Sequence, residues 1–317
     1  MKSQRILITG ALGHIGSKFI RSIKPDEFRE VLLVDNLSTQ RYCSLFNLPD
    51  KVPFHFIESD IRDKEFRLLC KHVDTVIHLA AITDATSSFK NQKEVWEVNY
   101  QGAQNVAKAC IDNGCNLFFP STTSVYTAQK SLISEDCPEF ELRPQSPYAQ
   151  SKLEAERMLT ALGKSCGLKF VICRLGTIFG VSVGMRFHTA INKFCWQACL
   201  GEPITVWRTA LEQKRPYLDL SDAVRLIKFV IKIRLFDGKI YNAATQNLTV
   251  KEIIKIIRKY IKNAKFTYVD AKVMNQLSFG ALNSRITEKG FDFNGNLDRR
   301  VKETVDLLRN SGVFYVK

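Results

Sequence analysis

Three glycines at regular spacing near the start of the chain constrain its fold more than any other feature. Gly10, Gly13 and Gly16 lie between the apolar run 5–9 and a helical pattern over residues 15–23. Glycine allows a sharp turn between a strand and a helix, and it lets an anionic group approach the free backbone N–H groups at the helix N-terminus. This strand, loop and helix arrangement predicts a binding site for a pyrophosphate group.

An acidic residue follows the second predicted strand. The apolar run 31–34 ends at Asp35, 19 residues after the last of the three glycines. A carboxylate at this position accepts hydrogen bonds from the ribose of an adenosine and repels a 2′-phosphate, which favours NAD over NADP. Arg41 lies close to Asp35 in the sequence and is an argument against this preference for NAD over NADP. Asp60 and Ile61 follow the third strand, where they are expected to contact adenine, although helix capping is the alternative role of Asp60.

Strand and helix patterns alternate through the first half of the chain. The strands are short and apolar on both faces, as in a parallel sheet covered by helices on both sides. Strands are predicted at residues 5–9, 31–34, 52–57, 74–79, 116–119 and 169–175, and helices at residues 15–23, 93–113, 148–162, 221–233, 249–261 and 298–309. The predicted fold is α/β, a doubly wound parallel sheet of the Rossmann type with a smaller C-terminal substrate-binding lobe.

The length and charge of the chain limit its architecture and its partners. With 317 residues, two domains are expected. Residues 1–175 and 216–235 are predicted to form an NAD-binding domain, and residues 176–215 and 236–317 the substrate-binding lobe. Lys and Arg number 46 against 32 Asp and Glu, a net charge of +14 without any run of five basic residues. Such diffuse charge favours an anionic small molecule over nucleic acid.

The sequence does not indicate a membrane, secreted or metal-binding protein. No apolar run reaches the ~18 residues of a membrane span, and the first residues do not resemble a signal peptide, so a cytoplasmic location is expected. The nine cysteines are scattered without a Cys-x-x-Cys pair. They are interpreted as reduced thiols rather than metal ligands.

A tyrosine and a lysine four residues apart indicate acid–base chemistry. Tyr148 and Lys152 share one face of a predicted helix, and Thr122 belongs to a hydroxyl-rich segment after an earlier strand. A nearby ammonium favours the phenolate and lowers the tyrosine pKa from its usual value of ~10. Tyr148 is then able to take a proton from a sugar hydroxyl while hydride leaves for NAD, with Thr122 orienting the same oxygen.

Further motifs follow in a fixed order along the chain. They are Gly10-x-x-Gly13-x-x-Gly16, Asp35-Asn36-Leu37-Ser38, Asp60-Ile61-Arg62-Asp63, His78-Leu79-Ala80-Ala81, Asn99, Ser121-Thr122-Thr123-Ser124-Val125-Tyr126, Pro147-Tyr148-x-x-x-Lys152, Arg174-x-Gly176-x-x-x-Gly180 and Arg215-x-Tyr217-x-x-x-Ser221-Asp222-Ala223. Together they resemble the extended short-chain dehydrogenases/reductases, in particular the nucleoside-diphosphate-sugar epimerase/dehydratase family. The resemblance covers most of the chain.

This resemblance implies an NAD that stays bound through the cycle and a nucleoside-diphosphate sugar that is oxidised at C4. It implies Tyr148 as the base, Lys152 as the residue that binds the nicotinamide ribose and lowers the tyrosine pKa, and Thr122 as the hydroxyl partner. The cofactor-binding residues expected besides Tyr148 and Lys152 are Gly10, Leu12, Gly13, His14, Ile15, Gly16, Asp35, Asn36, Ser38, Asp60, Ile61, Leu79, Ala80, Ala81, Thr83, Asn99 and Leu175. The expected substrate-binding residues are Thr83, Thr123, Ser124, Thr177, Arg186, Asn192, Arg208 and Arg215.

Departures from the family pattern narrow the reaction. Sugar-nucleotide 4,6-dehydratases of this kind carry Asp-Glu after the catalytic threonine, where this chain has Thr123 and Ser124, so dehydration is disfavoured. Many 4-epimerases carry Asn where this chain has Thr177. The arginine that often binds the substrate diphosphate has no clear match in the C-terminal region, where the candidates are Lys272, Asn275, Gln276 and Arg285.

The leading prediction is an NAD-dependent sugar-nucleotide 4-epimerase that is active without added NAD. The alternatives are a net NAD(P)-dependent sugar-nucleotide oxidoreductase or dehydratase, and a non-enzymatic cofactor sensor. The intact Thr122, Tyr148 and Lys152 argue against a sensor, which needs only the glycine loop. A homodimer is expected through the helices near residues 94–113 and 148–162.

Overall fold

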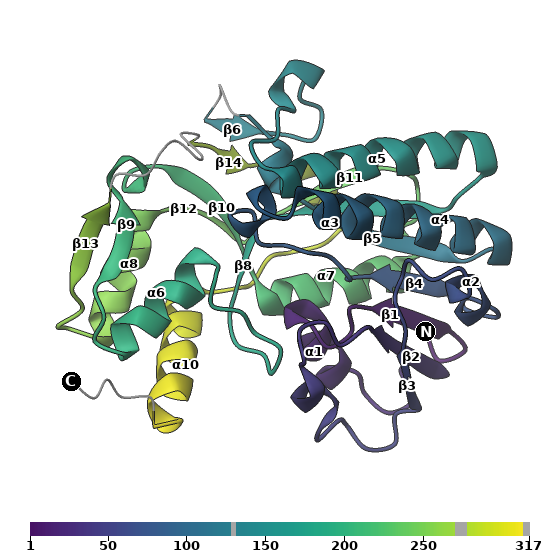
Figure 1. Ribbon diagram of the computed structural model, residues 1–317, viewed down its shortest axis with the longest axis horizontal. Coiled ribbons are helices and arrows are strands. Elements are labelled where there is room, and N and C mark those ends of the chain that lie inside the picture. Colours follow the sequence, from purple (N-terminus) through teal and green to yellow (C-terminus); the bar gives the residue numbers. More distant parts are fainter. Residues whose placement is uncertain (128–130, 270–277, 313–317) are drawn as a thin grey trace.

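Seven parallel strands form the central sheet, in the order β11-β7-β5-β4-β1-β2-β3 (Figure 1). The computed structural model describes residues 1–127, 131–269 and 278–312. The strands of this sheet are β1 (Arg5–Thr9), β2 (Glu30–Asp35), β3 (Phe54–Glu58), β4 (Thr75–His78), β5 (Asn116–Thr122), β7 (Phe170–Leu175) and β11 (Ile240–Ala243).

Helices cover both faces of the central sheet, which confirms the doubly wound fold (Figure 1). In β1, Ile6 and Ile8 join the core on the face of α1 and α7, whereas Leu7 joins the core on the face of α4 and α5. This alternation follows from the two-residue period of a strand, and both faces are apolar because both are buried. The covering helices are α1 (His14–Arg21), α2 (Phe66–Leu69), α3 (Gln92–Trp96), α4 (Gly102–Asn113), α5 (Pro147–Cys166) and α7 (Leu220–Ile233).

The helix predicted at 93–113 is divided in two. A π-helical turn, Glu97–Gln101, separates α3 from α4. Within that turn the buried Asn99 amide bonds the backbone of Ile82, accepting from its N–H at 2.8 Å and donating to its carbonyl at 2.9 Å. The turn therefore anchors the loop that follows β4, in keeping with the frequent use of π-turns near functional sites.

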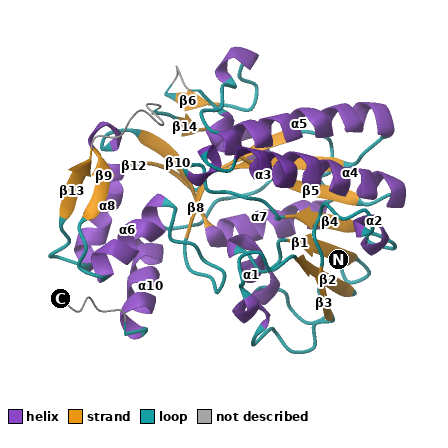
Figure 2. Ribbon diagram, in the orientation of Figure 1, coloured by secondary structure: helices purple, strands orange, loops and turns teal. Residues whose placement is uncertain are grey.

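A smaller lobe is built from later segments (Figure 2), and it has its own hydrophobic core. Outside the central sheet, the strands form a three-stranded sheet and two strand pairs, one of which joins β6, from the first half of the chain, to β14. They are β8 (Thr177–Phe179), β10 (Lys214–Asp219) and β12 (Gln246–Thr249), then β9 (Ile204–Trp207) with β13 (Phe266–Val269), and β6 (Leu132–Ile133) with β14 (Gly280–Ala281). The later helices are α6 (Ala190–Cys199), α8 (Val250–Tyr260), α9 (Ser284–Thr287) and α10 (Leu297–Asn310). None of the described helices is long and apolar enough to cross a membrane.

One strand of the central sheet lies in a region expected to belong to the lobe. Residues 236–317 are predicted as lobe, yet β11 pairs with β7 and forms the edge of the large sheet. The segment is only four residues long and contains Asn242, so its sequence does not carry a clear strand pattern. The chain therefore returns to the central sheet after α7 before it completes the lobe.

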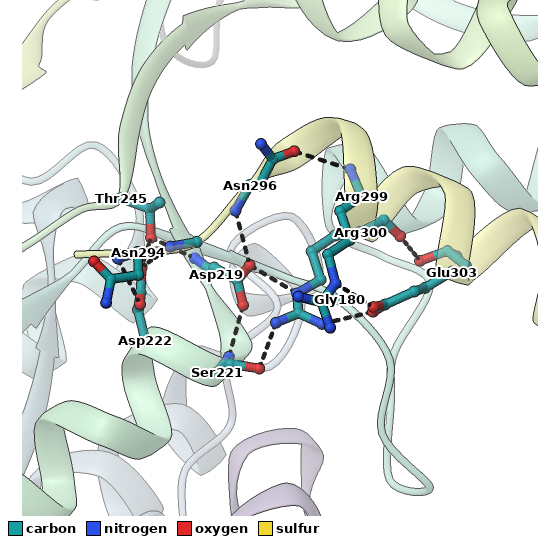
Figure 3. Close-up of polar contacts among 12 residues, drawn as sticks. Gly180, Asp219, Ser221, Asp222, Thr245, Asn294, Asn296, Arg299, Arg300 and Glu303 are labelled. Carbon is teal, nitrogen blue, oxygen red and sulfur yellow. Dashed lines mark hydrogen bonds and ion pairs between the residues drawn. The ribbon is translucent and has the colours of Figure 1, made fainter.

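Two buried aspartates at the start of α7 hold the C-terminal arm in place (Figure 3). Asp219 accepts a hydrogen bond from Arg300 Nε at 2.7 Å. Asp222 accepts from Thr245 Oγ1 at 2.7 Å and from the backbone N–H of Gly295 at 2.9 Å. A Cβ at residue 295 would lie 2.3 Å from the Cβ of Asp219, so this close approach requires glycine. The arm that leads into α10 is thus fixed to the edge of the cofactor-binding half.

Asp222→Ala is expected to lower the free energy of unfolding by about 3 kcal/mol, because it removes the buried carboxylate that accepts hydrogen bonds from Thr245 Oγ1 and from the backbone N–H groups of Asn294 and Gly295. Urea denaturation measures this loss. Asp50→Ala, at an exposed position, is the control and should change stability by less than about 0.5 kcal/mol. Equal losses in the two variants would contradict the assigned role of Asp222.

Candidate functional site

Two adjoining cavities lie at the carboxyl ends of the central strands. The larger has a volume of about 330 Å³ and the smaller about 150 Å³. Residues that follow β1 and β4 line both cavities, and Arg186 lies on both as well; the shared lining residues are Gly10, Gly13, Leu79, Ala81 and Arg186. The two cavities are therefore parts of one elongated site at the edge where open α/β sheets bind their ligands.

The glycine loop has the tight geometry that its sequence predicts. Gly10 has a φ of +64°, and a Cβ there would lie 2.6 Å from the backbone N of Ala80. A Cβ at Gly16 would lie 2.4 Å from the carbonyl oxygen of Ala11. Because both glycines are packed against backbone, the N-terminal turn of α1 lies directly beside the cavities. The site fits a dinucleotide, whose pyrophosphate requires this close approach to backbone N–H groups.

The smaller cavity carries the residues expected to bind adenosine. Asp35, Asn36, Asp60 and Ile61 all line it. Asp35 accepts a hydrogen bond from the backbone N–H of Leu12 at 3.1 Å, which holds the carboxylate at the end of β2. Asp60 is more heavily engaged than expected, since Arg62 and Asn36 both donate to it at 2.8 Å. These bonds, chiefly the one from Arg62, lower the pKa of Asp60 to about 2.

The larger cavity brings together the three residues predicted to be catalytic. Thr122 at the end of β5 and Tyr148 and Lys152 on α5 all line it. The side chains of Thr122 and Tyr148 are hydrogen-bonded to each other. Ser146 caps α5 by accepting from the N–H of Ala149 at 3.2 Å, with proline at the first helical position. This start of the helix places Tyr148 in its first turn.

Burial is the largest influence on the charges of Tyr148 and Lys152. It raises the pKa of Tyr148, while the hydrogen bond with Thr122 and the charge of Arg186 lower it. Burial lowers the pKa of Lys152 to about 7, against the opposing effect of Glu156. The Lys152 ammonium also lies 4.3 Å from the ring centroid of Phe119. Burial therefore has a larger effect on the pKa of Tyr148 than the expected lowering by Lys152.

A buried ion pair supports α5 one turn beyond Lys152. Arg174 on β7 donates from Nε to Glu156 Oε1 at 3.0 Å and from Nη2 to Oε2 at 2.6 Å. Both side chains are 2% exposed. Arg174 Nη1 also donates to the hydroxyl of Tyr126 at 2.9 Å, which in turn donates to Asn242 Oδ1 at 2.7 Å. The network fixes the inward face of α5. The sequence signal for this face was the four-residue spacing from Lys152 to Glu156, which places both residues on the same side of the helix.

Most of the residues predicted to bind cofactor or substrate line one of the two cavities. In addition to those above, these are His14, Ile15, Gly16, Ser38, Ala80, Thr83, Ser124, Leu175 and Thr177. Residues that line neither cavity are Leu12, Asn99, Thr123, Asn192, Arg208 and Arg215.

Several of the residues outside the cavities have definite contacts elsewhere. Asn192 is buried and donates to the carbonyl of Arg186 at 3.1 Å, so it shapes the site from behind. Arg208 lies over the ring of Tyr268 and Arg215 over the ring of Phe279, at 5.3 and 5.5 Å from the centroids.

The C-terminal candidates for a diphosphate-binding residue are not found at the site. Lys272, Asn275 and Gln276 lie outside the described residues. Arg285 donates to the carbonyl of Ile240 at 2.7 Å, behind the central sheet's edge strand rather than on either cavity.

The site also contains residues that the sequence interpretation did not assign. Asp84, Thr86 and Thr189 line the larger cavity, His188 lines it too, and Arg41 lines the smaller one. They lie in loops without a recognisable motif, so only their nearness to Asp35, Thr83 or Arg186 in the sequence marked them. Within the described part of the chain, no cluster of His, Cys, Asp or Glu is arranged to hold a metal ion.

Comparison with known proteins identifies the family. Residues 6–244 match the model of the NAD dependent epimerase/dehydratase family. The chain belongs to that family. A Bacillus subtilis (strain 168) relative, described as the uncharacterized UDP-glucose epimerase YtcB, is 30% identical over 263 residues, which cover 80% of this chain and 81% of the relative.

Two further comparisons show the range of the family. The Arabidopsis thaliana trifunctional UDP-glucose 4,6-dehydratase/UDP-4-keto-6-deoxy-D-glucose 3,5-epimerase/UDP-4-keto-L-rhamnose-reductase RHM2 is 26% identical over 96% of this chain, which spans 47% of that protein. The solved structure of MoeE5 in complex with UDP-glucuronic acid and NAD has a TM-score of 0.84 at 26% identity, over 97% of this chain and 99% of MoeE5. As a member of the NAD dependent epimerase/dehydratase family, the protein is an NAD-dependent enzyme.

Lys152→Met is expected to stabilise the protein at neutral pH, because it removes a buried ammonium. The pKa of Lys152 is lowered from 10.5 to about 7, so the cost of burying its charge is full below pH ~7 and disappears as the pH approaches 10.5. Urea denaturation at pH 6, 8 and 10 measures the effect.

The gain in unfolding free energy should be largest at pH 6 and should shrink steadily toward pH 10. Lys164→Met, on the exposed end of the same helix, is the control and should show no such pH dependence. A gain that is independent of pH, or a loss at pH 6, would show that Lys152 is not a destabilising buried charge.

Proposed function

We propose that the protein is an NAD-dependent epimerase that inverts C4 of a nucleoside-diphosphate sugar through a transient 4-keto intermediate. The observation that carries the proposal is the meeting of Thr122, Tyr148 and Lys152 in one cavity that continues into the glycine loop. The names of the Bacillus subtilis relative and of MoeE5's ligands, a UDP-glucose epimerase and UDP-glucuronic acid with NAD, support this substrate class.

Each catalytic side chain has a role that follows from its position. When bound, NAD supplies the acceptor and donor of the hydride at C4 of the sugar. Tyr148 is assigned the proton exchange with the C4 hydroxyl, since its phenol lies in the cavity and is hydrogen-bonded to Thr122. Thr122 is assigned the orientation of the same sugar oxygen. Lys152, on the same helix face one turn later, is assigned to the nicotinamide ribose.

The balance of charges sets when Tyr148 is able to act as a base. Burial raises its pKa, so in the field of the protein alone the phenol keeps its proton at neutral pH. Arg186 and the Thr122 hydroxyl act in the opposite direction. A tyrosine of this kind becomes basic only when further positive charge is placed beside it, which links proton transfer to the presence of the oxidised cofactor, whose nicotinamide ring is positively charged.

The residues after Thr122 favour epimerisation over dehydration. Thr123 is buried and does not line the cavity, and Ser124, which does line it, is not an acid. The single carboxylate among the described lining residues of the larger cavity is Asp84, and its Oδ1 accepts from the backbone N–H of Thr86 at 2.9 Å. Loss of water from a sugar needs an acid and a base in addition to the tyrosine, and the described lining of the larger cavity does not contain that second pair.

We further propose which segments bind the cofactor and which bind the substrate, and that two copies of the chain form a dimer. Residues 1–175 and 216–235, together with β11, are assigned to cofactor binding, and the remaining segments to the substrate. A cytoplasmic homodimer is proposed through α3, α4 and α5. Its support is that Phe89 and Trp96, at the edge of this helical face, are 41% and 38% exposed, and that the cysteines are free thiols, as in a reducing compartment.

Tyr148→Phe is expected to reduce turnover at least about a hundredfold, the scale of general acid–base catalysis, while NAD binding is kept. Chromatography of UDP-glucose, UDP-galactose and UDP-glucuronic acid after incubation without added NAD measures epimerisation of each. Tyr260→Phe, in α8, is the control and should retain full turnover. Unchanged turnover in Tyr148→Phe would remove this residue from the reaction, and steady accumulation of NADH would indicate a net oxidoreductase instead.

A further inference from the structure

Two arginines from different parts of the chain meet where the two cavities join. Arg41 follows β2 and lines the smaller cavity, and Arg186 follows β8 and lines both. The charge of Arg41 lowers the pKa of Arg186, which shows that the two guanidinium groups are near enough to repel each other. Two like charges brought together beside a cavity have to be compensated, by an acid or by a ligand.

The protein compensates these two charges only in part. Arg41 Nη1 and Arg186 Nε are buried nitrogen atoms without a hydrogen-bond partner. Arg186 Nη1 donates to Thr83 Oγ1 at 2.5 Å, a neutral acceptor. Asp35 and Asp84 act on Arg186 through their charges but do not form an ion pair with it among the described contacts. Buried N–H groups of this kind are normally satisfied, so two of them on residues that line the cavity junction indicate an anionic ligand.

The segment that carries Arg186 is tied to the glycine loop. The ring of His14 is hydrogen-bonded through Nε2 to the carbonyl of Gly180 at 2.9 Å, and the hydroxyl of Ser182 donates to the carbonyl of His14 at 2.9 Å. The backbone N–H of Gly184 donates to Ser17 Oγ at 3.0 Å. We call residues 180–186 the strap. It is bonded to His14 and Ser17 at the start of α1, and it carries Arg186 into the lining that the two cavities share.

The strap has no room to shift inward. A Cβ at Gly184 would lie 2.3 Å from the carbonyl oxygen of Leu12 and 2.6 Å from that of Gly13. Burial lowers the pKa of His14 to about 4, so its ring is neutral near pH 7 and its bond to Gly180 does not change there. Close packing and neutral hydrogen bonds therefore hold the strap, and with it the backbone of Arg186, against the glycine loop.

We propose that Arg41 and Arg186 together bind the pyrophosphate of NAD, so that the strap, which carries Arg186, retains the cofactor. The position supports this assignment. Asp35 marks the adenosine end of the site and Tyr148 the nicotinamide end, and the pyrophosphate is the part of a dinucleotide that connects them. This inference departs from the sequence prediction, which assigned Arg186 to the substrate. It rests on NAD binding and is independent of the reaction proposed above.

The test compares ligands that differ in the pyrophosphate. Full-length protein is stripped of nucleotide with charcoal and titrated calorimetrically with ADP-ribose, adenosine and, after saturation with NAD, UDP. The variants are Arg41→Met, Arg186→Met and the double variant. Arg299→Met, which removes an exposed arginine from α10, is the matched control for the change in net charge.

Each single variant should raise the Kd of ADP-ribose about tenfold or more, the loss expected for a charge-assisted hydrogen bond, and should leave the Kd of adenosine within about twofold. NAD should dialyse out of both variants faster than from the parent protein or Arg299→Met. Urea denaturation of the stripped proteins should show that every variant remains folded, because Arg41 Nη1 and Arg186 Nε have no partner to lose and Arg186→Met removes only the bond from Nη1 to Thr83 Oγ1.

Three results would overturn the proposal. An unchanged Kd of ADP-ribose would show that the arginines do not bind the pyrophosphate. Equal losses for ADP-ribose and adenosine would show a general distortion of the site. A selective loss of UDP binding would assign Arg186 to the substrate diphosphate. All three are binding measurements, so they remain decisive even if the enzyme does not epimerise any of the sugars tested.

Discussion

The buried ion pair between Glu156 and Arg174 is the interaction on which the site depends most. It joins α5, which carries Tyr148 and Lys152, to β7, the neighbour of the edge strand β11 in the central sheet. Through Tyr126 it continues to Asn242 on β11, whose amide donates to the carbonyl of Leu282 at 3.0 Å. A buried pair of this kind is weak evidence of stability, because desolvation offsets its attraction. Its effect here is to fix the rotation and register of α5.

The active site contains buried positive charges whose desolvation is unfavourable for folding. Lys152 is 3% exposed, and its pKa of about 7 shows how strongly burial opposes its charge. Arg41 and Arg186 are held near each other with nitrogen atoms that lack partners. At Asp219 and Asp222, by contrast, the buried carboxylates accept hydrogen bonds from Arg300, Thr245 and backbone N–H groups (Figure 3). The unfavourable charges of Lys152, Arg41 and Arg186 lie where an anionic dinucleotide and a polar sugar are expected, in keeping with the frequent occurrence of perturbed charges at functional sites.

The sequence predicts the central sheet and the cofactor loop well because both depend on local patterns. Short apolar runs predict buried strands, the three glycines predict a tight turn, and the proline before Tyr148 predicts the start of a helix. β11 was assigned to the wrong half because four residues with a polar member do not show a period. The contacts of Asn192 with Arg186 and of Asp60 with Arg62 also escaped prediction, since they depend on the backbone conformation of the loop that joins each pair, which the residue types alone do not fix. The ties between His14 and the strap join residues 166 positions apart, which no local pattern records.

The central claim is that hydrogen leaves C4 of the sugar and returns to the same carbon on the opposite face, without exchange with water. Incubation of the purified enzyme with a UDP-sugar deuterated at C4, without added NAD, tests this directly by mass spectrometry and NMR of the epimer. The account predicts that the epimer keeps essentially all of its deuterium at C4. Replacement of that deuterium by hydrogen from the solvent would show that the reaction proceeds by proton abstraction, and would contradict the account.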